Sequence, residues 1–176
     1  MKRLFLSLVL LGIAGATAGP NADLHQKRMA LGVLEKTFDG RLERSGGDDP
    51  FLLLGTTRGV YLQGYGAVLT AEVNLVNSAN ISPFRPTMPP EYKARLHTRK
   101  LERLPLLKQT MQDMLEASAA ALDSVPANEQ IVLGVSLFYY SWEDTTGLPS
   151  QVLMQANRQQ LLDHKGSADY IRIQEY

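Results

Sequence analysis

Residues 130–142 read QIVLGVSLFYYSW, and this stretch decides the fold. Apolar side chains occupy both sets of alternate positions in it. They are Ile131, Leu133, Val135, Leu137 and Tyr139 on one face and Val132, Phe138, Tyr140 and Trp142 on the other. A strand that is apolar on both faces is typical of the centre of a β-sheet. The sequence therefore predicts a sheet with residues 130–142 as a central strand.

Residues 65–76 predict a longer second strand, because apolar and polar side chains alternate along it. Thr70, Glu72 and Asn74 face away from the apolar positions, so one face of this strand packs and the other is partly wet. Shorter strands are predicted at residues 51–54, 60–63, 151–156 and 170–174. Residues 151–156 return from the central strand as a β-hairpin.

Two amphipathic helices are predicted from apolar residues at helical spacing. They cover residues 21–44 and 91–125. The second carries an apolar seam from Leu104 to Val125, which faces either the core or a partner. Pro105 lacks a backbone N–H inside this stretch, so a kink or a division into two helices is expected.

The predicted order of elements gives an α+β fold. Strands before and after the long helix can pair in one sheet with the helices on one face. We therefore expect a single α+β domain over residues 19–176, with one mixed or antiparallel sheet of about five strands. A long, Pro-kinked helix and an N-terminal helix pack on that sheet. Residues 77–90 hold four prolines and should form an extended connecting segment.

Residues 1–18 have the pattern of a secretory signal peptide. Two basic residues precede an apolar run at residues 4–13, and small residues precede the expected cleavage site before Gly19. The run is too short for a membrane anchor, and no later segment approaches the ~20 apolar residues of a spanning helix. We therefore expect an exported protein, periplasmic or extracellular, with no membrane span in the mature chain.

Composition excludes several kinds of chemistry. The chain has no cysteine, so it has no disulfide, no thiolate metal site and no cysteine nucleophile. The numbers of basic and acidic residues are equal, at 18 each, which argues against a nucleic-acid partner. The three histidines lie in three different predicted elements, so we expect no metal site and no cofactor.

A basic ridge is predicted on the long helix, where Arg95, Arg99 and Arg103 follow one another at intervals of four. Such a ridge suits a phosphate, a lipid head group or an acidic partner. The alternative is a solvated helix face, because Glu91 and Glu102 stand at pairing distance along the helix.

A loop near residue 143 combines acidic and aromatic side chains. Glu143 and Asp144 follow Tyr140 and Trp142. Paired carboxylates carry out acid–base chemistry, and a carboxylate beside an aromatic ring suits sugar binding. The alternative is an ordinary hairpin turn, because adjacent side chains of an extended chain point to opposite faces.

Three strings carry a resemblance to a group of uncharacterised exported bacterial proteins. They are TRGVYLQGYGAV at residues 57–68, RLPLL at residues 103–107 and EQIVLGV at residues 129–135. The similarity spans most of residues 50–163. It implies a bacterial, exported protein and brings no activity, cofactor or site.

These observations favour a non-enzymatic binding or assembly module. The candidate partner surface joins Pro86 of the Pro-rich segment to Arg95, Arg99 and Arg103, and its partner is an envelope protein or a small ligand. The residues leave open whether there is any catalysis.

Two alternatives remain. One is a small hydrolase or a carbohydrate- or ligand-binding protein that uses Glu143 and Asp144 beside Tyr140 and Trp142. The other is an oligomer formed through the seam at residues 104–125, on the condition that the domain's own sheet does not cover it.

Overall fold

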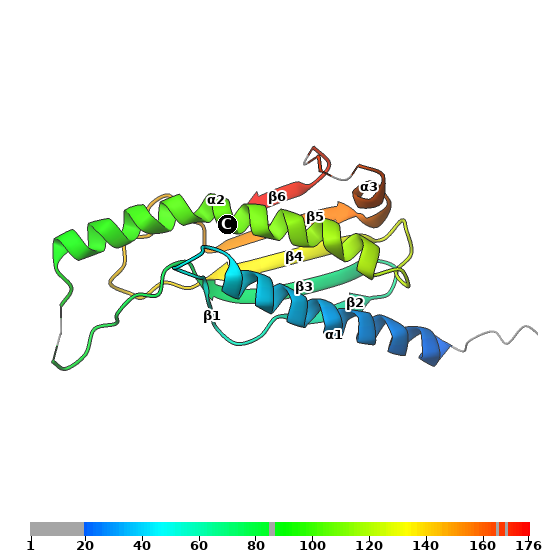
Figure 1. Ribbon diagram of the computed structural model, residues 1–176, viewed down its shortest axis with the longest axis horizontal. Helices are drawn as coiled ribbons and strands as arrows, with labels where there is room; N and C mark the ends of the chain where they lie inside the picture. The colour runs from blue at the N-terminus through cyan, green and yellow to red at the C-terminus, as the bar shows by residue number, and fades with distance from the viewer. Residues whose placement is uncertain (1–19, 85–86, 165, 168) are drawn as a thin grey trace, which may run out of the picture.

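The computed structural model describes residues 20–84, 87–164, 166–167 and 169–176. The predicted signal peptide at residues 1–18, and Pro86 of the candidate partner surface, lie outside the described residues. The elements are α1 (Pro20–Arg44), β1 (Leu52–Leu53), β2 (Arg58–Leu62), β3 (Gly66–Asn74), α2 (Pro90–Ala121), β4 (Gln130–Leu137), β5 (Gln151–Asn157), α3 (Arg158–Asp163) and β6 (Arg172–Glu175). They form two layers, a sheet and the helices on it (Figure 1).

The described strands form one mixed sheet, which confirms the predicted α+β fold class. Its order is β1-β3-β4-β5-β6, and β2 also pairs with β3. The neighbours β3 and β4 are parallel, with Ala67 opposite Ile131, whereas the other pairs are antiparallel. The crossover between the parallel strands contains α2. Strand β4 lies between β3 and β5, so the prediction of a central strand is confirmed.

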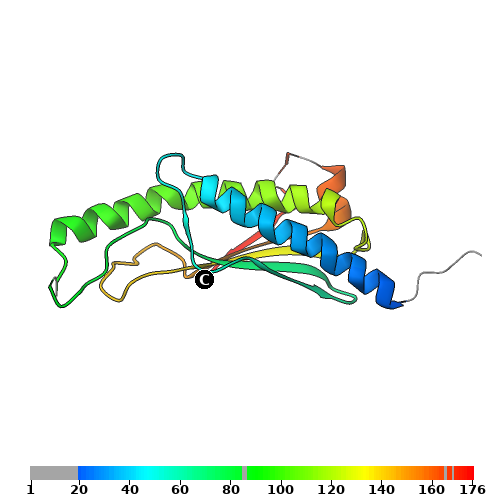
Figure 2. The same ribbon diagram turned by 60° about the horizontal axis from the view of Figure 1, so that its bottom comes forward.

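The core lies between the sheet and the long helices, which cover the same face of the sheet (Figure 2). Alternate side chains of β3 and β4, such as Leu69 and Leu133, are fully buried. The apolar seam of α2 packs on them, with Leu107, Met111 and Met114 at 0% exposure. The domain's own sheet therefore covers this seam, so the condition for an oligomer through residues 104–125 is not met.

Helix α2 is one continuous helix across Pro105, so of the two alternatives expected there, the division into two helices is wrong. A proline inside a helix removes the hydrogen bond to the carbonyl four residues earlier, which here is that of Leu101, and its ring crowds the same carbonyl. Leu104 and Leu107 on either side of it are buried against the sheet. Tertiary packing of this kind provides most of a helix's stability in a folded protein.

Strand β4 ends at Leu137, earlier than the predicted residue 142. Residues 138–150 leave the sheet as a loop. The Tyr139 hydroxyl donates to the Pro149 carbonyl at 2.8 Å, which joins the two ends of this loop. Its side chains pack on α2, and this packing replaces the cross-strand pairing that a longer hairpin would make.

Helix α1 covers the free edge of β2. The Gly59 N–H donates to Glu35 Oε1 at 2.8 Å, and the Gly59 carbonyl accepts from Arg28 Nη1 at 3.0 Å. The Thr57 N–H donates to Asp39 Oδ1 at 2.8 Å. Unpaired backbone groups at a sheet edge invite pairing with other chains. Side chains of α1 satisfy these groups at β2.

Candidate functional site

The two surfaces singled out in the sequence meet at the N-terminal half of α2. This half of the helix extends past the ends of the strands, and two segments, residues 77–84 and 138–150, run beneath it (Figure 1). Within residues 77–90, the described part of the Pro-rich segment contains no helix before Pro90 begins α2. Proline is favoured at the first position of a helix, where its missing N–H has no intrahelical partner to lose.

A pocket of about 460 Å³ opens beside α2 at this end, and we call it the α2 pocket. Its lining residues are Val76, Asn77, Tyr92, Arg95, Leu96 and Arg99. A neighbouring hollow of about 360 Å³ shares Tyr92 and Arg95 and continues towards Met88. The Tyr92 hydroxyl accepts a hydrogen bond from the Ala79 N–H at 3.3 Å, which ties the Pro-rich segment to the helix.

The three arginines predicted as one ridge have different environments. Arg99 Nη2 lies 2.7 Å from Asp49 Oδ2, and Arg103 Nη1 lies 3.0 Å from the same oxygen. The Arg103 side chain is only 11% exposed. Arg95 is exposed and forms no ion pair within the described residues. The exposed basic surface therefore consists of Arg95 and Arg99, and Arg103 lies beneath it.

Arg103 holds the loop after α1 against α2. Its guanidinium carbon lies 4.8 Å from the centroid of the Phe51 ring, and burial lowers the pKa of this group. Gly46 has a φ of +100°, and a Cβ there would lie 2.5 Å from Arg103 Nη2. This close approach requires glycine. It places Asp49 where one carboxylate oxygen forms ion pairs with both Arg99 and Arg103.

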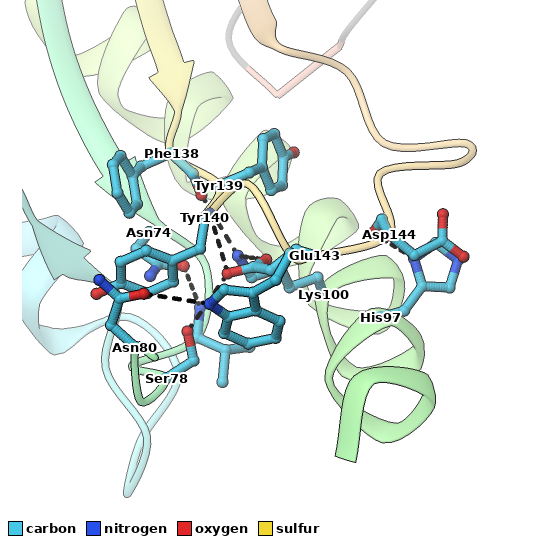
Figure 3. Close-up of polar contacts among 12 residues, drawn as sticks. Asn74, Ser78, Asn80, His97, Lys100, Phe138, Tyr139, Tyr140, Glu143 and Asp144 are labelled. Carbon is cyan, nitrogen blue, oxygen red and sulfur yellow. Dashed lines mark hydrogen bonds and ion pairs between the residues drawn. The ribbon is translucent and has the colours of Figure 1, made fainter. Parts of the chain in front are cut away.

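The Glu143 carboxylate forms a buried ion pair with Lys100 (Figure 3). The two side chains are 2% and 0% exposed. Lys100 Nζ also donates to the Phe138 carbonyl at 3.3 Å. The other Glu143 oxygen accepts from the Tyr140 N–H at 3.3 Å and from the Ser78 hydroxyl at 3.5 Å. Burial lowers the pKa of Lys100, and its contact with Glu143 opposes that change.

Asp144 points away from Glu143, so the two carboxylates do not converge on one point (Figure 3). The Asp144 carboxylate accepts from the Thr146 N–H at 2.9 Å, and this bond holds its pKa below the ordinary value. The backbone carbonyl oxygen of Asp144 lies 2.9 Å from His97 Nδ1. The local turn around Thr146 therefore occupies this carboxylate.

Trp142 connects the loop at residues 138–150 to the α2 pocket. Its ring stacks on Tyr140, with centroids 5.7 Å apart and an interplanar angle of 11°. The centroid of the Tyr92 ring, which lines the pocket, lies 6.0 Å away on α2. Trp142 Nε1 donates to Asn80 Oδ1 at 3.2 Å. Trp142 thus contacts the loop, the helix and the Pro-rich segment.

Several residues that build this region were not singled out from the sequence. Lys100 had a detectable signal, because a charged residue occurs on the buried face of α2 between Leu96 and Leu104. A lysine in that position is almost never fully buried unless it is paired. Asp49 and Tyr92 carried no such signal, since their partners lie on segments far away in the chain.

The described residues show neither a metal centre nor a membrane-spanning helix. Within these residues no group of three or more His, Asp or Glu side chains is arranged to hold a metal ion. No helix among them is long and apolar enough to cross a membrane. Comparison with known protein families, curated proteins and solved structures finds no significant match to this chain.

Proposed function

We propose that this protein is an exported, non-enzymatic binding module that recognises an anionic group through the α2 pocket. Export rests on the signal peptide predicted at residues 1–18. One observation carries the proposed recognition: Arg95 and Arg99 line one open pocket, and Arg95 has no carboxylate partner among the described residues. The ligand is a group on an envelope protein or a free small molecule.

The chemistry of the lining defines the ligand. A guanidinium presents several N–H donors in a fixed plane, which matches the two oxygens of a carboxylate or the oxygens of a phosphate. Asp49 offsets only one of the two positive charges of Arg99 and Arg103, so Arg95 adds to a positive surface. Val76 and Leu96 supply an apolar wall. The pocket therefore suits an anionic group next to an apolar one.

The loop around Glu143 offers no comparable support for hydrolysis. A general acid–base pair needs two carboxyl groups that reach one substrate. Glu143 is buried and paired with Lys100, and Asp144 closes its own turn. The hydrolase or carbohydrate-binding alternative stays a hypothesis without a geometric observation in its favour.

Trp142 provides a direct test, because it is the chain's only tryptophan and contacts Tyr92 of the pocket. Its fluorescence is titrated with two probes, an acidic pentapeptide with a central phenylalanine and inorganic phosphate. We expect a saturable change with the peptide, and weaker binding of phosphate, which lacks the apolar part. Arg95→Glu should weaken peptide binding by about tenfold or more, because a hydrogen bond to a charged group is worth about 1.5–3 kcal/mol.

Arg172→Glu is the matched control, because Arg172 is an exposed arginine on β6. It undergoes the same change of charge away from the pocket and should leave peptide binding unchanged. The proposal fails if neither probe gives a saturable change, or if the two charge reversals weaken binding equally.

A further inference from the structure

A second polar pocket lies at the other end of the molecule. It has a volume of about 390 Å³ and is enclosed by the start of α1, the end of β2 and the segment before β4. These elements meet at the end of the molecule opposite the N-terminus of α2 (Figure 1). The lining residues are Asp23, Leu24, Lys27, Tyr61, Gln63, Gly64, Pro126 and Glu129. We call it the Glu129 pocket.

Glu129 is a buried carboxylate that the chain satisfies on one side only. The residue is 8% exposed. Its Oε1 accepts from the Tyr61 hydroxyl at 3.1 Å and from the Gly64 N–H at 3.2 Å. Its Oε2 is buried and has no hydrogen-bond partner in the described part of the chain. Leaving a buried carboxylate oxygen without a donor is costly, which favours a donor from outside the chain.

Lys27, the cation among the lining residues, does not fill this role. Lys27 forms an ion pair with Asp23, and its Nζ lies 4.5 Å from the centroid of the Tyr61 ring. The contact with Asp23 raises the pKa of Lys27, so this ammonium stays charged and occupied. Burial, with the hydrogen bond to Glu129, raises the pKa of Tyr61, so its hydroxyl keeps its proton and donates.

The charges of the lining indicate the class of ligand. Lys27 offsets one carboxylate, that of Asp23, and the charge of Glu129 remains uncompensated. A group that both carries a positive charge and donates N–H bonds satisfies Glu129 Oε2 and this charge together. Leu24 and Pro126 offer apolar surface to an aliphatic chain.

We propose that the Glu129 pocket binds a primary ammonium group, which pairs with the Glu129 carboxylate. Oε2 is closed to solvent in this structure, so binding requires the Glu129 side chain to turn towards the pocket that it lines, where the ammonium donates to Oε2. Two sources present this chemistry, a free aliphatic amine and a lysine side chain of a partner protein. This proposal is independent of the α2 pocket, since the two pockets share no residue.

Calorimetric titration of the whole protein with three probes tests the proposal at low salt. The probes are n-butylammonium, tetramethylammonium and a neutral-capped peptide with one central lysine. We expect n-butylammonium to bind and tetramethylammonium, which has the same charge and no N–H, to bind at least about tenfold more weakly. Tighter binding of the peptide than of n-butylammonium assigns the site to a partner's lysine, and the reverse order assigns it to a free amine.

Two variants with opposite expected effects keep the test independent of folding defects. Glu129→Gln should weaken n-butylammonium binding at least about tenfold, because the charge is lost. Lys27→Met should strengthen it several-fold, because a positive charge that lines the pocket and repels the ligand is removed. Glu102→Gln changes an exposed carboxylate on α2 and should have no effect.

The proposal is overturned if n-butylammonium and the lysine peptide both fail to bind, or if tetramethylammonium binds as well as n-butylammonium. It is also overturned if folded Glu129→Gln binds like the wild type. If Glu129→Gln does not fold, the Lys27→Met variant decides: an unchanged or reduced affinity for n-butylammonium overturns the proposal.

Discussion

Lys100→Met is the substitution that most directly tests how the region around α2 is held together. Methionine retains most of the length of the lysine side chain and removes its charge. Glu143, at 2% exposure, then keeps only the Tyr140 N–H at 3.3 Å and the Ser78 hydroxyl at 3.5 Å. Removing one partner of a buried ion pair typically costs about 3–5 kcal/mol, because the other charge stays buried without compensation. We expect a loss of this size in the free energy of unfolding.

The loss is measured by urea denaturation, followed by circular dichroism and by the fluorescence of Trp142. For a chain of this size it corresponds to a fall in melting temperature of roughly 6–20 °C. Adding Glu143→Met to Lys100→Met should recover at least about 2 kcal/mol, because no buried charge remains.

Lys36→Met is the control, because Lys36 is an exposed lysine on α1. The same substitution there should change stability by no more than about 0.5 kcal/mol. A loss below about 1 kcal/mol in Lys100→Met, or no recovery in the double variant, refutes the reasoning.

Three further predictions concern pH, backbone geometry and the sheet edge. Burial raises the pKa of Tyr139 to about 12. The folded state then keeps a proton that the unfolded chain loses near pH 10, so stability falls by about 1.4 kcal/mol per pH unit between pH 10 and 12. Tyr139→Phe should remove this part of the decline in urea denaturation at pH 9 and 11.5, and identical declines in both proteins contradict it. Gly66 has a φ of +137°, and a Cβ there would lie 1.9 Å from the Gln130 carbonyl oxygen, so Gly66→Ala should cost more than about 3 kcal/mol in thermal unfolding. A melting temperature within 2–4 °C of the wild type, equivalent to about 1 kcal/mol, argues against that geometry. Glu35→Ala removes the acceptor of the Gly59 N–H, and it should cost about 1–3 kcal/mol and speed hydrogen exchange at that amide. Unchanged exchange at Gly59 means that α1 does not protect the edge.

The sheet was largely predictable because its signals are local. Alternation along residues 65–76 identifies a strand with one buried face, and apolar residues on both faces of 130–137 identify its central neighbour. Local patterns do not encode pairing direction, so the choice between a mixed and an antiparallel sheet stayed open. The parallel pairing of β3 and β4 follows from the way α2 packs back on the sheet.

The site was less predictable because its contacts are between distant segments. Regular spacing predicted one ridge for Arg95, Arg99 and Arg103, but each step of four residues turns about 40° around a helix. Arg103 therefore lies about 80° away from Arg95, towards the buried face of α2. The local rule also suggested glutamates of the same helix as partners, whereas the carboxylate that pairs with Arg99 and Arg103 is Asp49 from a distant loop.

Glu143 is a second residue whose partner could not be predicted from local sequence. Its place in a loop that combines acidic and aromatic side chains suggested a ligand carboxylate. Its partner Lys100 lies on α2, and no local pattern connects the two residues. The position of Lys100 between Leu96 and Leu104, on the apolar side of α2, is the trace that this ion pair leaves in the sequence.

The most direct test of the proposed binding function is chemical-shift mapping by NMR with the acidic pentapeptide. Saturable shifts are predicted at Asn77, Tyr92 and Arg95 of the α2 pocket, with the same dissociation constant at each, and they should be lost in Arg95→Glu. Shifts confined to other surfaces, such as the exposed side chains of Val60 and Leu62 on β2, contradict the account, as does a spectrum that the peptide leaves unchanged.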